Sequence, residues 1–326
     1  MRNLSLIDKI EESIISILKS YNFVNAALAM GSCARGEETY CLNATGEKEL
    51  LSDYEMLIIV VEGTNIALLD SELKELAKKL KKVIKTEGFD LDWSIKTVSE
   101  IKRLDKRFIF YEAKESGRLI YGNAAILEYF PKITVKNLNF CELNTIVIHR
   151  LYHVLKGYLS ENLHYQKYVI ARNTLDIATA VLPHMGVMEC GYRRRNEVFL
   201  AQADENFFPQ SLKRRMEDYL LMKIKYDSPI YSKYKLEEMK ENFVEDMLLL
   251  YQYQKYVQKG RPFVRDSRML LSAVYRMNVK KFIQWIRWPV IMNRLYNNMI
   301  ALLKSNVDDE QMMRVVCNTM MQIFGY

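Results

Sequence analysis

Residues 24–37, VNAALAMGSCARGE, and residues 52–60, SDYEMLIIV, decide the fold. The first stretch is apolar from 24 to 30 and ends at Gly31-Ser32, as expected for a buried strand that enters a tight turn. Residues 55–61 are rich in Ile, Leu and Val and predict a second strand. The two stretches therefore predict a strand, a Gly-Ser turn, a connecting loop and another strand.

The flanking sequence extends this pattern into a small α/β unit. Residues 5–19 predict a helix with Ser5 as its cap, and residues 89–98 alternate as a third strand would. Residues 38–50 are polar and predict a loop. Residues 65–85 predict a long helix with an apolar stripe. Its expected inward-facing members are Leu69, Leu73, Leu76, Leu80 and Val83.

The sequence changes character after residue 131. Helical patterns dominate from there, at 143–159, 165–182, 212–225, 236–256 and 279–303. We place a boundary near 131–140, with domains at 1–135 and 136–326. The predicted fold is an α/β core with a small mixed sheet, joined to an all-α C-terminal domain.

Composition limits the function classes. The chain is 49% hydrophobic and 27% charged, as in a globular protein, and its longest clear apolar run, 56–61, is too short to cross a bilayer. Acidic residues interrupt the first helix, unlike in a secretory signal. Five scattered cysteines without a Cys-x-x-Cys motif indicate neither disulfides nor zinc. We expect a cytoplasmic protein without membrane contact, whose net charge of +7 suits an anionic ligand.

The Gly-Ser turn and the acids after it suggest phosphate and metal chemistry. Gly31 allows close approach of the backbone to a ligand, and Ser32 adds a hydroxyl beside the free N–H groups of a helix start. Asp53 and Glu55 flank Tyr54, so strand alternation directs both carboxylates to one side. Hard oxygen ligands beside a phosphate site are typical of magnesium–nucleotide binding.

This combination resembles the signature of the DNA polymerase β-like nucleotidyltransferase superfamily. Residues 31–36 and 52–60 carry the resemblance, and GRLIYG at 117–122 more weakly resembles the segment that closes the catalytic domain in minimal and antibiotic-modifying members. The resemblance implies that Gly31 and Ser32, with Arg35 nearby, bind the triphosphate. It also implies that Asp53 and Glu55 bind two Mg²⁺ ions, with Mn²⁺ as the alternative. The family often has Asp where Glu55 stands, and the loop between Gly36 and Asp53 is longer than usual.

A third carboxylate is expected on the strand at 89–98. Asp90 and Asp92 share one face there, so alternation does not choose between them. We prefer Asp92, which lies deeper in the strand, as a metal ligand that helps accept the proton of the acceptor.

On the helix at 165–182, Arg172 is a candidate for binding the triphosphate; a surface ion pair with Asp176 is the alternative.

These residues predict transfer of a nucleotide from a nucleoside triphosphate, with ATP favoured, to an acceptor hydroxyl with release of pyrophosphate. A small-molecule acceptor is preferred. The alternatives are a protein or tRNA acceptor and a cyclic or oligonucleotide product. Nucleic-acid binding is possible but not favoured, because the basic residues form only short clusters, at 193–195 and 213–215. An inactive nucleotide-binding regulatory module is the hypothesis from another class.

Overall fold

The computed structural model describes residues 5–42, 48–84, 89–140, 160–225 and 229–258, together with scattered residues between 143 and 157. The helix expected at 279–303 lies outside the described residues, as does much of the helix expected at 143–159. None of the helices in the described ranges combines the length and apolar character needed to span a bilayer.

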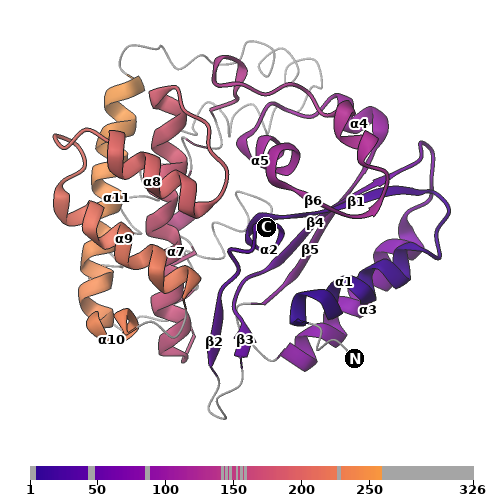
Figure 1. Ribbon diagram of the computed structural model, residues 1–326, viewed down its shortest axis with the longest axis horizontal. Coiled ribbons are helices and arrows are strands. Elements are labelled where there is room, and N and C mark those ends of the chain that lie inside the picture. The colour runs from indigo at the N-terminus through magenta and orange to yellow at the C-terminus, as the bar shows by residue number, and fades with distance from the viewer. Residues whose placement is uncertain are drawn as a thin grey trace, which may run out of the picture.

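Within the described residues, four strands form a mixed sheet in the order β5-β4-β1-β6. They are β1 (Val24–Met30), β4 (Tyr54–Val60), β5 (Leu91–Thr97) and β6 (Arg118–Gly122). Strand β1 runs antiparallel to both β4 and β6, whereas β4 and β5 are parallel (Figure 1). The three predicted strands are thus confirmed, and the segment after residue 117 supplies a fourth.

Helices cover both faces of this sheet. Helices α1 (Leu6–Leu18) and α3 (Ala67–Ile84) pack on one face, in a core that includes Tyr54 and Met56. The opposite core includes Leu57 and its partners, which are Ala26, Leu28, Ile59, Ile101, Ala113, Ile126 and Phe130. Alternation along β4 therefore directs Tyr54 and Glu55 to opposite faces.

The second face is covered by short elements. They are α4 (Val98–Lys102), α5 (Phe108–Ser116) and the 3₁₀ turn η1 (Ala124–Tyr129), followed by η2 (Val135–Asn137). Helix α5 lies over the sheet and contacts α2 (Gly31–Arg35), the short helix that follows β1 (Figure 1).

Two local predictions were wrong. Val83 is 74% exposed, because Ile84 takes the last inward position of α3, four residues after Leu80. Residues 38–50 are not all loop, since β2 (Tyr40–Leu42) and β3 (Lys48–Leu50) pair as an antiparallel hairpin. The last residue of β3, Leu50, lies in the core between the sheet and helices α1 and α3. The next residue, Leu51, lies in the core of the helical region.

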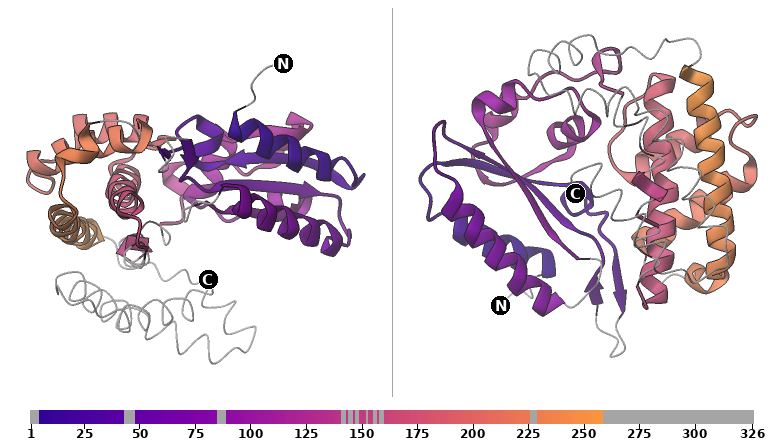
Figure 2. Two further views of the ribbon diagram at one scale, coloured as in Figure 1. Left: turned by 90° about the horizontal axis from the view of Figure 1, so that it is seen from below. Right: turned by 180° about the vertical axis from the view of Figure 1, so that it is seen from behind.

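The described part of the chain after residue 160 contains helices joined by loops and no strand, in agreement with the prediction. It contains α7 (Leu163–Val181), α8 (Tyr192–Gln202), α9 (Gln210–Ile224) and α11 (Leu236–Gln258), with the short η3 (Leu182–Met185) and α10 (Ile230–Lys233) between them. These helices share one hydrophobic core to the side of the sheet (Figures 1 and 2). The boundary at residues 135 and 136 stays a prediction.

Candidate functional site

The Gly-Ser turn lies directly beside the first residues of β4. Gly31 begins α2 (Gly31–Arg35) with a φ of +65°, a conformation that glycine adopts at little cost. A Cβ atom on Gly31 would lie 2.7 Å from Oε2 of Glu55, closer than real Cβ contacts allow. The absence of a side chain at this position therefore lets the carboxylate of Glu55 sit against the turn.

The parallel pairing of β4 with β5 brings carboxylates of the two strands together. Glu55 is the register partner of Asp92, and the N–H of Tyr54 donates to the carbonyl of Asp90 at 2.8 Å. Asp53 immediately precedes β4. The side chain of Tyr54 points to the other face, where its hydroxyl donates to Glu11 at 2.8 Å. Sequence alternation correctly predicted this division between Tyr54 and Glu55.

Negative charge accumulates at this end of the sheet. Burial raises the pKa of Asp53, and nearby Arg172 opposes the shift. Burial also raises the pKa of Glu55; Arg172 again opposes it, and the charges of Asp53 and Asp92 add to it. Carboxylates that repel one another in a partly desolvated place favour a cation beside them.

Asp90 and Asp92 have different surroundings. The side chain of Asp90 is 47% exposed, forms an ion pair with Lys81 at 3.0 Å and accepts a hydrogen bond from the N–H of Leu91. Asp92 is exposed and lies next to Glu55 in the register. Among the described residues, no group of three or more His, Cys, Asp or Glu side chains is arranged to hold a metal ion. The assignment of the third ligand to Asp92 stays a prediction.

Arg172 reaches this site from the helical region. Its Nη1 lies 3.5 Å from Oδ2 of Asp53. Asp176, which is one helical turn further along α7, has other partners in the described structure. Its carboxylate is 2.8 Å from Nε of Arg150 and accepts a hydrogen bond from Thr179. The i,i+4 ion pair proposed for Arg172 was therefore wrong.

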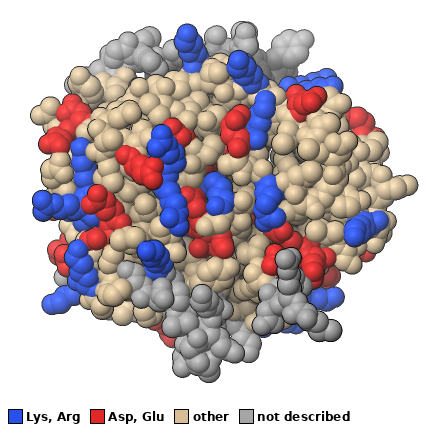
Figure 3. All heavy atoms as spheres, viewed as in Figure 1, with Lys and Arg blue, Asp and Glu red and all other residues tan. Residues whose placement is uncertain are grey.

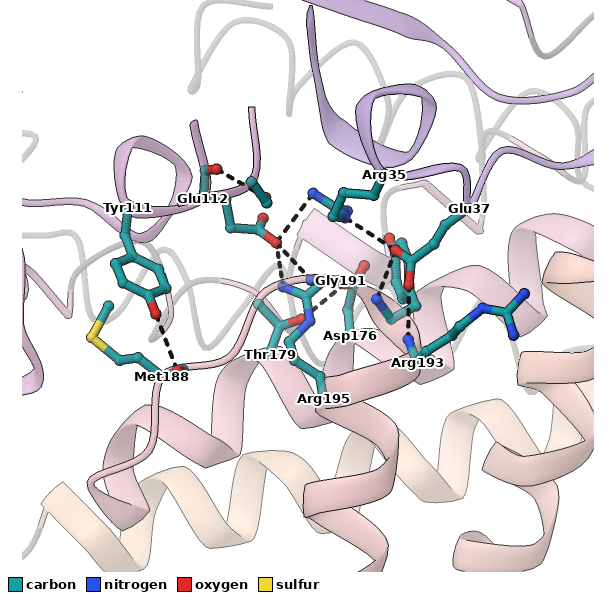
Figure 4. A network of polar contacts seen from close by, with 12 residues as sticks. Arg35, Glu37, Tyr111, Glu112, Asp176, Thr179, Met188, Gly191, Arg193 and Arg195 are labelled. Atoms are coloured by element: carbon teal, nitrogen blue, oxygen red, sulfur yellow. Dashed lines mark hydrogen bonds and ion pairs between the residues drawn. The ribbon is translucent and has the colours of Figure 1, made fainter. Parts of the chain in front are cut away.

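Arg35 belongs to a network that joins the turn to the helical region (Figure 4). Its guanidinium lies 3.0 Å from Glu37 and 3.4 Å from Glu112 of α5, and only 11% of its side chain is exposed. Glu112 also pairs with Arg195 at 3.1 Å. The described contacts of Arg35 are thus to acids of the protein, and its predicted role in nucleotide binding draws no support from them.

Glu37 caps a helix that lies far away in the sequence. Its carboxylate accepts hydrogen bonds from the N–H groups of Tyr192 and Arg193, at 2.9 and 3.0 Å, at the start of α8 (Figure 4). Gly191, at the cap position, has no side chain for this purpose. The N-terminus of a helix attracts negative charge, so this contact fastens the residues after α2 to the helical region.

Lys223 of α9 adds to this contact between the residues after α2 and the helical region. Its side chain is buried, and Nζ donates to the carbonyl of Glu37 and to the hydroxyl of Thr39, both at 3.1 Å. No local pattern in the sequence pointed to Glu112 or Lys223. Glu37 directly follows the motif at 31–36, but its partner could not be found from spacing.

Cys33 is unsuited to nucleophilic catalysis. It is buried in α2, and its thiol donates to the carbonyl of Asp53 at 3.3 Å. Burial raises the pKa of Cys33 to about 12, so the thiol stays protonated at neutral pH. Its observed contact instead ties the turn to the residue before β4.

The face drawn in Figure 3 carries Lys and Arg side chains interspersed with Asp and Glu. Over the described part of that face, positive charge is not gathered into one continuous surface. A duplex or a folded RNA usually binds to a continuous positively charged surface, which this face does not offer in its described part.

No protein-family model matches this chain, and no curated protein matches it in sequence. The geometry of the site is therefore the basis for the functional conclusion.

Proposed function

We propose that this protein is a metal-dependent nucleotidyltransferase that moves a nucleoside monophosphate from a nucleoside triphosphate to an acceptor hydroxyl. One observation carries the proposal. Glu55 and Asp92 are register partners on parallel strands, and Glu55 fits against a side-chain-free turn at Gly31. The site thus combines acidic oxygens with the backbone N–H groups of the turn at Gly31 and Ser32, which we assign to the phosphates.

Magnesium, with manganese as the alternative, is the metal that these acids would hold. Asp53, Glu55 and Asp92 supply hard carboxylate oxygens, the ligands that Mg²⁺ prefers, and burial raises the pKa of Asp53 and Glu55. When bound, the metal would neutralise charge on the phosphates and on the attacking oxygen.

The protein's own groups have separate tasks in the proposed reaction. The turn at Gly31 and Ser32 holds the triphosphate, and Arg172 offsets its negative charge. The acceptor oxygen forms a bond to the α-phosphorus while the bond from that phosphorus to the pyrophosphate oxygen breaks. The acceptor proton passes to the carboxylate of Asp92, which is exposed and therefore accessible to an acceptor.

A small hydroxylated molecule is the favoured acceptor. The mixture of charges in Figure 3 gives no continuous basic surface on the described part of that face for a large polyanion. ATP is the favoured donor, and the other triphosphates are compared with it in the test below.

The test is incubation of the purified protein with each α-labelled triphosphate, Mg²⁺ and either a set of hydroxylated small molecules or cell extract. We expect the label on a small molecule, with an equal amount of pyrophosphate released. Asp53→Asn should abolish transfer, whereas Glu75→Gln should leave it unchanged, because Glu75 is 59% exposed on the outer side of α3. Label on protein, RNA or an oligonucleotide would change the acceptor. Triphosphate binding without pyrophosphate release would refute the enzyme and favour the regulatory module.

A further inference from the structure

The ion pair between Arg172 and Asp53 places a cation of the protein at a proposed metal ligand. Arg172 lies on α7, in the helical region, and Asp53 precedes β4 of the sheet. Their closest atoms, Nη1 and Oδ2, are 3.5 Å apart. Asp176, four residues further along α7, contacts Arg150 and Thr179 instead. Asp53 is therefore the carboxylate with which Arg172 is paired in the described structure.

This pair is loose enough to exchange partners. Charge-assisted hydrogen bonds of arginine are usually about 2.7–2.9 Å long, and the 3.5 Å contact is longer. The side chains of Arg172 and Asp53 are 31% and 25% exposed, so both can meet an incoming ligand. Lys223 is not free to exchange partners in this way, because it is buried and its ammonium donates to the carbonyl of Glu37 and the hydroxyl of Thr39.

We propose that Arg172 acts as a displaceable counter-ion, which keeps free divalent cations off Asp53 until a nucleotide arrives. The inference rests on the proposed function. In the nucleotide-free protein, the charge of Arg172 partly neutralises Asp53 and repels a divalent metal ion that approaches this carboxylate. A triphosphate offers the guanidinium a better partner, since its planar fork matches phosphate oxygens. Arg172 then leaves Asp53, and metal and nucleotide bind together.

The proposal gives Arg172 opposite effects on two ligands. As a counter-ion it weakens the binding of metal alone, and as a phosphate ligand it strengthens the binding of nucleotide. A residue that only stabilised the fold would weaken both when replaced. A residue that only bound phosphate would leave the affinity for metal alone unchanged.

The test measures Mn²⁺ binding to the nucleotide-free protein by electron paramagnetic resonance. Nucleotide binding is measured separately by calorimetry with a non-hydrolysable ATP analogue. Arg172→Gln removes the charge, and Arg172→Lys keeps the charge but loses the fork. Arg172→Met replaces the glutamine variant if that protein does not fold. The matched control is Arg194→Gln, which removes a charge from an exposed pair with Glu197 on α8.

We expect Arg172→Gln to bind Mn²⁺ alone about tenfold more tightly and the ATP analogue at least about tenfold more weakly, each a change of about 1.4 kcal/mol. Arg172→Lys should keep the wild-type affinity for Mn²⁺ and still lose nucleotide affinity. The control should change neither.

Two results would overturn the inference, and they are distinguishable. Unchanged or weaker Mn²⁺ binding in the neutral variant, with transferase activity present in the wild type, removes the counter-ion role alone. Failure of the wild type and of the neutral variant to bind Mn²⁺, with or without nucleotide, removes the proposed metal-dependent function as well.

Discussion

Replacing Gly31 with alanine tests the close approach between the turn and Glu55. The new Cβ would lie 2.7 Å from Oε2 of Glu55, so this oxygen has to retreat by about 0.7 Å to reach ordinary contact at 3.4 Å. The carboxylate ends a flexible side chain and can move, but it then leaves its place beside Asp92. A displacement of about 1 Å in a catalytic site can reduce turnover about a hundredfold.

The same substitution also carries a backbone penalty. Gly31 has a φ of +65°, and a residue with a Cβ atom loses about 1–2 kcal/mol in that conformation. Gly36, at the other end of α2, has a φ of +66°, but a Cβ atom there would meet nothing within 4 Å among the described residues. Gly36→Ala therefore has the backbone penalty without the contact to Glu55.

The comparison uses urea denaturation for stability and pyrophosphate release for turnover. We expect both variants to lose about 1–2 kcal/mol of unfolding free energy. Only Gly31→Ala should lose about a hundredfold in kcat, while Gly36→Ala stays within about tenfold of the wild type. Equal losses of activity in the two variants would refute the claim that displacement of Glu55 matters.

Three further sets of substitutions test the site and the contact of Glu37 with the start of α8 in the helical region. Asp92→Asn should lower kcat at least about a hundredfold and Asp90→Asn less than about tenfold, because only Asp92 is the register partner of Glu55; reversed magnitudes would move the third ligand to Asp90. Glu55→Gln should raise the unfolding free energy at about pH 8, because burial raises the pKa of Glu55 and disfavours its charged form. That gain should vanish below about pH 4, where the carboxyl is protonated in both the folded and the unfolded protein, and a gain independent of pH would contradict the cause. Glu37→Gln should cost about 0.5–2 kcal/mol of unfolding free energy by weakening the cap of α8, whereas Glu197→Gln, at an exposed pair on the same helix, should cost less than about 0.5 kcal/mol; equal losses would argue against the cap.

Local patterns predicted the elements that local forces determine. The strands on either side of the Gly-Ser turn are short, apolar and buried, and Ser5 caps α1 with reciprocal hydrogen bonds to Asp8. Alternation alone predicted that Glu55 and Tyr54 lie on opposite sides of the sheet, as the two cores show. Sequence could not determine which residue of β5 stands beside Glu55, since that depends on the register of two strands separated by α3.

Contacts between distant segments explain what the sequence did not predict. The helical spacing on α7 suggested Asp176 as the partner of Arg172, but the packing of α7 beside the sheet brings Asp53 within reach instead. Spacing in the sequence also gave no sign that Glu112 of α5 would lie beside Arg35. The hairpin at β2 and β3 was missed because its strands are short and lie in a mostly polar stretch.

The most direct test of nucleotidyl transfer follows the two ends of the same triphosphate. The protein is incubated with Mg²⁺, a pool of hydroxylated acceptors and ATP labelled in parallel at the α- or the γ-phosphorus. Attack at the α-phosphorus predicts that the α label joins the acceptor while the γ label leaves in pyrophosphate, and that Asp53→Asn stops both. Transfer of the γ label to the acceptor, or turnover that persists in a folded Asp53→Asn variant, would contradict the account.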